Sequence, residues 1–142
     1  MKKMLLAIVI ITLLGSYIYP QGKILSKEEA NKLFGAVLVS KQIPSSELKA
    51  LTSNSTKIIM FKILNDDVYI LGDNRKVLSP ANAMVNETEP FSAYSVSIVQ
   101  DLLNKGNEPT TFIEKRNEVL TITNGNFTLE YSLKCPPFCV DD

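Results

Sequence analysis

The only two cysteines of the chain, Cys135 and Cys139, lie four positions apart in the closing stretch KCPPFCVDD. Such a pair can form a structural disulfide, act as a redox-active dithiol or contribute to a metal site. The spacing differs from the C-x-x-C of thioredoxin-like centres, and no helix is predicted to follow it. The negative charges of Asp141 and Asp142 disfavour a reactive thiolate, and two sulfurs are too few for a closed zinc site. We therefore expect a structural Cys135–Cys139 disulfide, with a thiol oxidoreductase or redox sensor as the alternative.

The first residues of the chain indicate the compartment in which these thiols lie. Lys2 and Lys3 precede the apolar stretch MLLAIVIITLL, and GSYIYPQG follows it. This order is typical of a secretory signal peptide, which we predict over residues 1–21. The apolar stretch is shorter than the roughly 18 to 20 residues that a spanning helix needs, although no A-x-A cleavage tripeptide is present. We expect a periplasmic or secreted protein, which touches a membrane only if this segment is retained as an anchor.

The sequence lacks the usual catalytic constellations. It contains no histidine, which removes the commonest general base, triad partner and transition-metal ligand. No G-x-G-x-x-G, P-loop, H-E-x-x-H or G-x-S-x-G motif occurs. Ser46 and Lys49 fit the S-x-x-K pattern of serine acyl-enzymes, but the companion S-D-N and K-T-G motifs are missing, and a serine at a helix start is ordinarily a cap. We predict no catalytic residue, no cofactor and a protein that is not an enzyme.

Acidic residues in two neighbouring turns suggest a metal site only weakly. Asp66-Asp67 and Asp73-Asn74 offer the oxygen ligands that calcium prefers. Their spacing does not follow an EF-hand loop, and Asp and Asn are common turn residues for conformational reasons. A surface calcium site therefore stays an alternative, and no metal ligand is predicted.

The remaining acidic residues suggest no paired-acid chemistry. Glu114 and Glu118 flank a predicted turn beside Lys115 and Arg116. This mixture of charges is typical of a solvated face with weak ion pairs. We expect both glutamates on such a face.

Size and charge limit the possible partners. Without the signal segment about 120 residues remain, which suits a single domain over residues 22–142. The 15 basic residues less Lys2 and Lys3 face 15 acidic ones, so the formal charge is about −2. A near-neutral chain without a basic patch argues against nucleic acid as a partner.

Start and stop signals divide the chain into short elements. Ser26 with Glu29 forms a capping box and Gly35 provides a stop, so a helix is predicted over residues 27–34. A strand over residues 36–43, a helix over residues 45–53 and three strands within residues 57–78 follow. Residues 79–94 contain two prolines and little periodicity, and we predict a loop there. A helix over residues 96–105 and strands over residues 110–116, 119–123 and 127–133 complete the pattern.

The last two strands are predicted to form a hairpin with Asn124-Gly125 as its two-residue turn. This register places Ile122 opposite Phe127 and Leu120 opposite Leu129. Threonines occupy the other face, which indicates a sheet with one solvated side.

These elements predict an α+β fold, with an antiparallel sheet of about six to seven short strands and two or three short helices on one face. A helix followed by three strands occurs over residues 45–78 and again over residues 95–133. This recurrence suggests a tandem repeat, with ordinary α+β patterning as the alternative.

An exported domain without catalytic residues is expected to act by binding. The predicted loop is longer than typical connections, and long loops of this kind are often functional. We expect its candidate contact residues to be Asn82, Met84, Asn86, Glu87 and Phe91. The expected partner is another envelope or extracellular protein, bound through this loop or through an exposed sheet face or edge.

Overall fold

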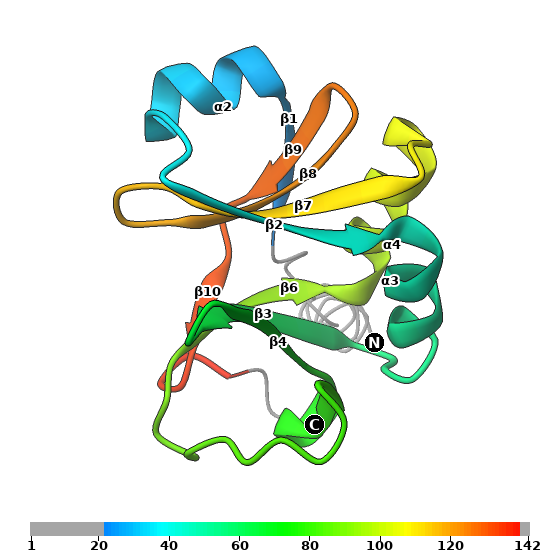
Figure 1. Ribbon diagram of the computed structural model, residues 1–142, viewed down its shortest axis with the longest axis vertical. Helices are drawn as coiled ribbons and strands as arrows, with labels where there is room; N and C mark the ends of the chain where they lie inside the picture. Colours follow the sequence, from blue (N-terminus) through cyan, green and yellow to red (C-terminus); the bar gives the residue numbers. More distant parts are fainter. Residues whose placement is uncertain (1–21, 140–142) are drawn as a thin grey trace, which may run out of the picture.

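The computed structural model describes residues 22–139 and shows an α+β fold of two antiparallel five-stranded sheets and three α-helices (Figure 1). The predicted fold class is confirmed, whereas the predicted signal segment, residues 1–21, lies outside the described residues. The elements in chain order are β1 (Lys23–Ser26), α2 (Lys27–Phe34), β2 (Val39–Pro44), α3 (Ser45–Thr52), β3 (Ile58–Leu64), β4 (Asp67–Leu71), the 3₁₀ helix η1 (Asp73–Arg75), β5 (Val77–Ser79), β6 (Phe91–Ser95), α4 (Val96–Gly106), β7 (Thr110–Lys115), β8 (Leu120–Asn124), β9 (Phe127–Glu130) and β10 (Leu133–Cys135).

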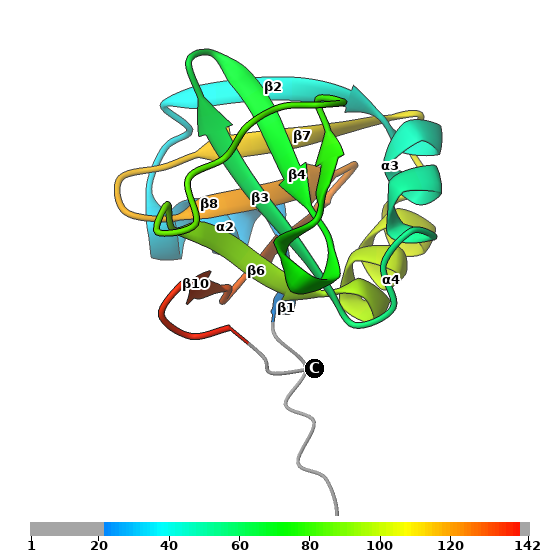
Figure 2. The same cartoon turned by 90° about the horizontal axis from the view of Figure 1, so that it is seen from below.

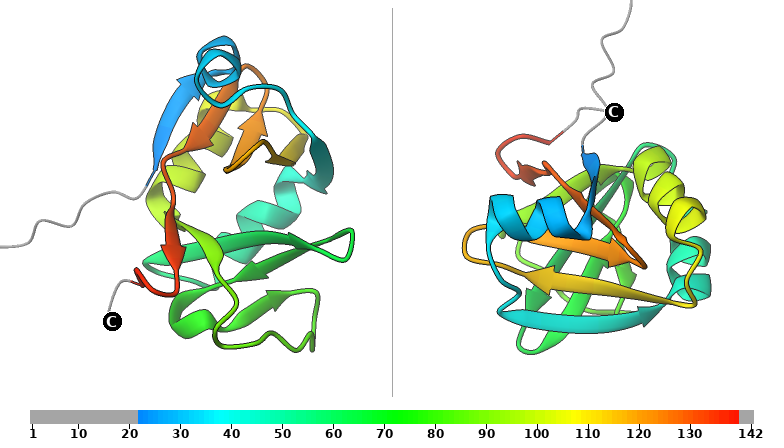
Figure 3. Two further views of the ribbon diagram at one scale, coloured as in Figure 1. Left: turned by 90° about the vertical axis from the view of Figure 1, so that its left-hand side faces the viewer. Right: turned by 90° about the horizontal axis from the view of Figure 1, so that it is seen from above.

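The strands divide into two sheets that pack against each other. The first sheet has the order β1-β9-β8-β7-β2 and the second has the order β10-β6-β3-β4-β5. Figures 1 and 2 show α3 and α4 side by side at one end of the pair of sheets, while α2 lies on the outer face of the first sheet (Figure 3, right). One buried core cluster joins Leu48 of α3, Phe61 of β3, Val99 of α4 and Ile122 of β8. The helices therefore cover more than the single face that the sequence predicts.

The strand count exceeds the prediction because β1, β6 and β10 were not anticipated. The stretch FSAYS forms β6, which lies between β10 and β3 and has four buried residues out of five. Pro90 precedes this strand and so does not interrupt its ladder, which explains why the proline-based prediction of a loop through Tyr94 was wrong. None of the helices within residues 22–139 is long and apolar enough to cross a membrane.

The chain passes twice through the same order of elements, namely a strand, a helix and three antiparallel strands. The first unit is β2-α3-β3-β4-β5 and the second is β6-α4-β7-β8-β9. The units exchange their leading strands, because β2 pairs with β7 and β6 pairs with β3. The first residue of each helix also donates a hydrogen bond to the other unit. At the start of α3 the Ser45 N–H donates to the Pro109 carbonyl at 2.8 Å, and at the start of α4 the Val96 N–H donates to the Lys57 carbonyl at 2.9 Å. Neither unit therefore contains a complete sheet.

Helix α2 begins and ends where the sequence predicts. The Ser26 Oγ accepts from the Glu29 N–H at 3.1 Å, and the Glu29 carboxylate accepts from the Ser26 N–H at 2.9 Å. Gly35 ends the helix with φ +78°, a conformation that favours glycine. These contacts satisfy backbone N–H groups that the first helical turn would otherwise leave without partners.

The face of the first sheet that was expected to be solvated is buried, and an arginine organises it. The Arg116 side chain is 0% exposed, and its Nη2 lies 3.2 Å from the Glu114 Oε2. Its Nη1 donates to the Asn31 Oδ1 at 2.8 Å and to the Gly35 carbonyl at 2.5 Å, which attaches α2 to the sheet. The Glu114 carboxylate also accepts from Thr123 at 2.8 Å. The expected solvated position of Glu114 was wrong because α2 covers these polar groups, whereas Glu118 is exposed.

The hairpin between β8 and β9 forms, but its predicted register was wrong. Asn124 pairs with Phe127 and Ile122 pairs with Leu129, so the two-residue turn is Gly125-Asn126. The buried Asn124 amide donates to the Ser45 Oγ at 3.0 Å and accepts from the Glu108 N–H at 3.0 Å. These bonds hold Asn124 in the strand and move the turn by one residue. Each residue of β8 pairs with the residue of β9 two positions beyond its predicted partner. Because two positions is the period of a strand, every side chain still lies on its predicted face of the sheet.

Candidate functional site

The predicted disulfide is present at the C-terminal end of the described chain. Cys135 and Cys139 are bonded, with their Cα atoms 4.7 Å apart. Cys135 is the last residue of β10, pairs with Phe91 of β6 and is fully buried, whereas Cys139 is exposed. The bond therefore closes a ring that has one sulfur in the core of the second sheet and the other at the surface.

Arg75 connects this ring to the segment between β5 and β6. Its Nη1 donates to the Cys135 carbonyl at 2.7 Å, and its Nη2 donates to the Glu89 carbonyl at 2.9 Å and to the Asn86 carbonyl at 3.2 Å. The guanidinium also lies over the Phe91 ring, 5.3 Å from its centroid. Partial burial lowers the pKa of Arg75 and nearby acidic side chains oppose this change, so the group stays charged. One cation thus holds two chain segments that are far apart in sequence.

The segment over residues 80–90 is an ordered loop with further internal bonds. The Ala83 N–H donates to the Pro80 carbonyl at 3.2 Å, and the Glu89 N–H donates to the Asn86 carbonyl at 3.0 Å. The Asn86 side chain accepts from the Thr88 N–H at 3.0 Å in an Asx turn. Glu89 also forms an ion pair with Lys62 of β3. The loop is therefore attached at several points within the chain.

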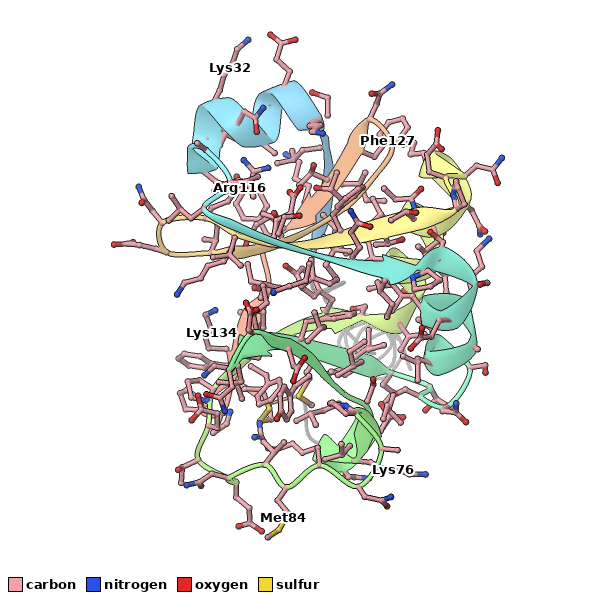
Figure 4. The ribbon with its side chains drawn as sticks, in the orientation of Figure 1. Lys32, Lys76, Met84, Arg116, Phe127 and Lys134 are labelled. Atoms are coloured by element: carbon pink, nitrogen blue, oxygen red, sulfur yellow. A yellow bond between two sulfur atoms is a disulfide. The ribbon has the colours of Figure 1, made fainter. Side chains whose placement is uncertain are left out.

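Four of the five residues predicted for the interaction loop lie at the surface. Met84 is 98% exposed and points away from the molecule at its lower edge (Figure 4). Asn82, Asn86 and Glu87 are exposed as well. Phe91 is different, because it is the first residue of β6 and is fully buried under the Arg75 guanidinium. It supports the base of the loop and does not belong to its surface.

The acidic turn residues have structural partners. The Asp73 Oδ2 accepts from the Thr56 N–H at 2.8 Å, and its Oδ1 accepts from the Ile58 N–H at 2.9 Å. Desolvation acts to raise the pKa of Asp73, but these hydrogen bonds outweigh it and hold the pKa well below its ordinary value. Asp66 forms an ion pair with Lys41 at 2.5 Å. Within residues 22–139, no three acidic or cysteine side chains come together as a metal-binding group.

The S-x-x-K pair does not form a nucleophile and base. Ser46 and Lys49 are both exposed on α3, and no hydrogen bond joins their side chains in the described part of the chain. The residue before α3 is Pro44, so Ser46 is not a helix cap either.

Two residues of this region were missed by the sequence reasoning. Arg75 has no local signal, because its three carbonyl acceptors come from residues 11 to 60 positions away. Glu130 ends β9 and is buried, and desolvation raises its pKa to about 7. A charged residue in an otherwise apolar and threonine-rich strand was the available signal for Glu130.

Comparison of the chain with known protein families, curated proteins and solved structures finds no significant match.

Proposed function

We propose that this protein is an exported, non-enzymatic domain that binds another envelope or extracellular protein through the loop over residues 80–90. The observation that carries the proposal is a nearly fully exposed Met84 on a loop whose backbone Arg75 holds in place. A loop that is ordered before binding loses little conformational entropy on association. Methionine side chains are flexible and polarizable, so they adapt to an apolar partner surface.

A photo-crosslinking experiment tests this proposal in cells that export the protein. A photoreactive amino acid at position 84 is expected to form a discrete adduct with one partner protein. The same group at Lys76, which is exposed but outside the loop, is the matched control and is expected to give no such adduct. Adducts that are identical from both positions, or none from position 84, would contradict binding through the loop. Fractionation of the same cells tests export, since a protein found only in the cytoplasm would refute it.

A thiol oxidoreductase is the second candidate, and one contact favours it. The Arg75 Nη1 lies 3.9 Å from the buried Cys135 Sγ, while Cys139 is open to a substrate thiolate. In such a reaction the substrate thiolate attacks the Cys139 sulfur, the disulfide breaks and Cys135 leaves as a thiolate beside the arginine. A second substrate thiol then displaces Cys139, which oxidises the substrate and leaves the protein reduced.

The reduction potential separates the two candidates. A structural disulfide is expected to have a potential below about −300 mV, whereas catalytic dithiols lie between about −270 and −120 mV. Thiol alkylation across glutathione and dithiothreitol buffers, read by mass spectrometry, gives the value. Insulin reduction by the wild type that is lost in Cys135→Ser would favour the oxidoreductase, and an inert wild type would exclude it.

A further inference from the structure

Residues of both sheets line an opening of about 210 Å³. The turn between β7 and β8 and strand β10, which contribute to it, lie on the side of the molecule opposite α3 and α4 (Figure 1). The second sheet contributes Phe61 and Lys62 of β3 and Lys134 of β10, and the first sheet contributes Lys115 and Leu120. In Figure 4 Lys134 lies below Arg116 on this side of the molecule. The volume corresponds to about seven water molecules, which is enough for a small organic molecule.

The floor of the opening is apolar. Phe61 and Leu120 are buried members of the main core cluster, and Ile63 packs against the same cluster. Val119 and Pro90 complete this lining. A hydrocarbon group placed on these side chains would lose contact with water, which is favourable by roughly 25 cal/mol for each Å² removed.

The rim of the opening is cationic. Lys62, Lys115 and Lys134 line it together with one acidic residue, Glu118. Arg116 is also in the lining, but its guanidinium is buried under α2 and contributes no charge to the rim. Glu114 pairs with Arg116 and Glu89 pairs with Lys62. With both pairs neutral, Lys115 and Lys134 face Glu118 and the half-ionised Glu130, whose pKa is raised to about 7, so the net charge at neutral pH lies between about 0 and +1. A ligand with a single negative charge complements it.

The positive charges of two of these lysines, Lys115 and Lys134, are not fully neutralised by nearby acidic groups. Within the described residues no hydrogen bond or ion pair reaches the Lys115 ammonium group, which is exposed beside the opening. The Lys134 Nζ donates to the Ser92 Oγ at 2.9 Å. Desolvation lowers the pKa of Lys134, Glu130 opposes this effect, and the positive charge of Lys62 lowers the pKa further. An anion between Lys62 and Lys134 would relieve their mutual repulsion.

We propose that this opening binds a small organic monocarboxylate, whose carboxylate contacts Lys115 and Lys134 while its hydrocarbon body lies on the partly exposed side chains of Ile63 and Val119, above the buried Phe61 and Leu120. Pro90 and the Glu89–Lys62 pair place one end of the loop over residues 80–90 beside the opening, but the exposed loop residues Asn82, Met84, Asn86 and Glu87 do not line it, so the proposal does not depend on the proposed protein partner. Carboxylate recognition by lysine uses point charges, which suits these flexible side chains.

Titration of the ¹⁵N-labelled protein with hexanoate tests the site by NMR. Saturable shifts are expected at the amides of Lys62, Ser92 and Leu120 at ligand concentrations up to roughly 10 mM. Hexanol, which lacks the charge, and acetate, which lacks the hydrocarbon body, are each expected to bind at least about fivefold more weakly. The absence of saturable shifts, or equal binding of hexanol, would overturn the proposal.

Variants that each remove one lysine charge test where the carboxylate of the ligand binds. Lys115→Gln removes an ammonium group without a structural partner, so the fold is retained and hexanoate affinity is expected to fall about threefold or more. Lys134→Gln is the second variant, with the same expectation. Lys76→Gln removes one exposed positive charge far from the opening and is the matched control (Figure 4). An equal loss of affinity in Lys76→Gln and Lys115→Gln would indicate nonspecific attraction and refute the assigned site.

Discussion

The side chain of Arg75 holds the backbone of the loop over residues 80–90 against the disulfide ring. It satisfies three carbonyl groups of the loop over residues 80–90 and of the disulfide ring, and it covers the Phe91 ring. The planar guanidinium presents several donors in fixed directions, which a lysine cannot reproduce. Arg75 therefore adds attachments from outside the loop to the internal hydrogen bonds and the Glu89–Lys62 pair that also hold it.

Replacing Arg75 by lysine is expected to loosen the loop and weaken the fold. The carbonyl groups of Asn86 and Glu89 lose a charge-assisted donor, and such hydrogen bonds contribute about 1.5 to 3 kcal/mol each. We expect the free energy of unfolding to fall by about 2 to 3 kcal/mol in urea denaturation. Limited proteolysis is expected to cleave residues 80–90 faster in this variant. Lys76→Arg is the control, and unchanged cleavage of Arg75→Lys would contradict the role of the guanidinium.

At the scale of elements, the attachment of α2 depends on a buried ion pair. Arg116 reaches α2 through Asn31 and through Gly35, which follows the helix, and it reaches the sheet through Glu114 and Thr121. A buried pair adds little net stability, but removing one partner leaves the other charge without compensation. The Arg116–Glu114 pair therefore fixes the position of α2 on the sheet more than it adds to the net free energy of unfolding.

Arg116→Ala is expected to lower the free energy of unfolding by about 3 to 5 kcal/mol, because Glu114 becomes a buried unpaired charge. The double variant Arg116→Met with Glu114→Gln is expected to lose less than half of that amount. Urea denaturation of both variants gives the comparison, and Glu118→Gln serves as the exposed control. A double variant that is less stable than Arg116→Ala would refute the explanation by an unpaired charge.

Elements with local signals were predictable from the sequence, and elements defined by distant contacts were not. The capping box of Ser26 and Glu29 fixed the limits of α2, because its bonds lie within four residues. The turn after β8 was misplaced since Asn124 binds Ser45, which lies 79 positions away. The disulfide was predicted from the expected oxidising compartment and the spacing of the cysteines, whereas no local pattern marks the three acceptors of Arg75. Sequence reasoning thus identified most of the loop surface but not the residue that orders it.

At the scale of the whole molecule, Glu130 lies where the chain passes from the first sheet to the second. Desolvation raises its pKa to about 7, while Lys134 and hydrogen bonds with Ser132 act in the opposite direction. The folded protein therefore holds the proton of this carboxyl more tightly than the unfolded chain does. Its contribution to stability is fully present below about pH 4.5 and is lost as the pH rises towards 7.

The wild type is accordingly expected to lose up to about 3 kcal/mol of stability from this group between pH 4.5 and pH 7, at about 1.4 kcal/mol per pKa unit. Glu130→Gln removes this dependence, so the variant is expected to be more stable than the wild type at pH 8 and similar to it at pH 4.5. Urea denaturation of both proteins at the two pH values measures the difference. A stability difference between wild type and variant that does not change with pH would show that the carboxyl is not titrating in this range.

The exchange of leading strands predicts that the two units cannot separate without unfolding. The first unit supplies β2 to the sheet of the second, and the second supplies β6 to the sheet of the first. Helices α3 and α4 also pack against each other within one core. Both cysteines follow the second unit in the chain, so no disulfide joins the two units covalently.

A protease site inserted between Ala81 and Asn82, which are both exposed, allows a direct test. After cleavage the two fragments are expected to elute together from a gel-filtration column in native buffer, with an unchanged circular dichroism spectrum. They are expected to separate in denaturant, and each purified fragment alone is expected to be unfolded because its sheet lacks a strand. The uncleaved insertion variant controls for the added residues. Fragments that separate in native buffer while remaining folded would show that each unit is self-sufficient, and the reciprocal strand exchange would then not be what holds the molecule together.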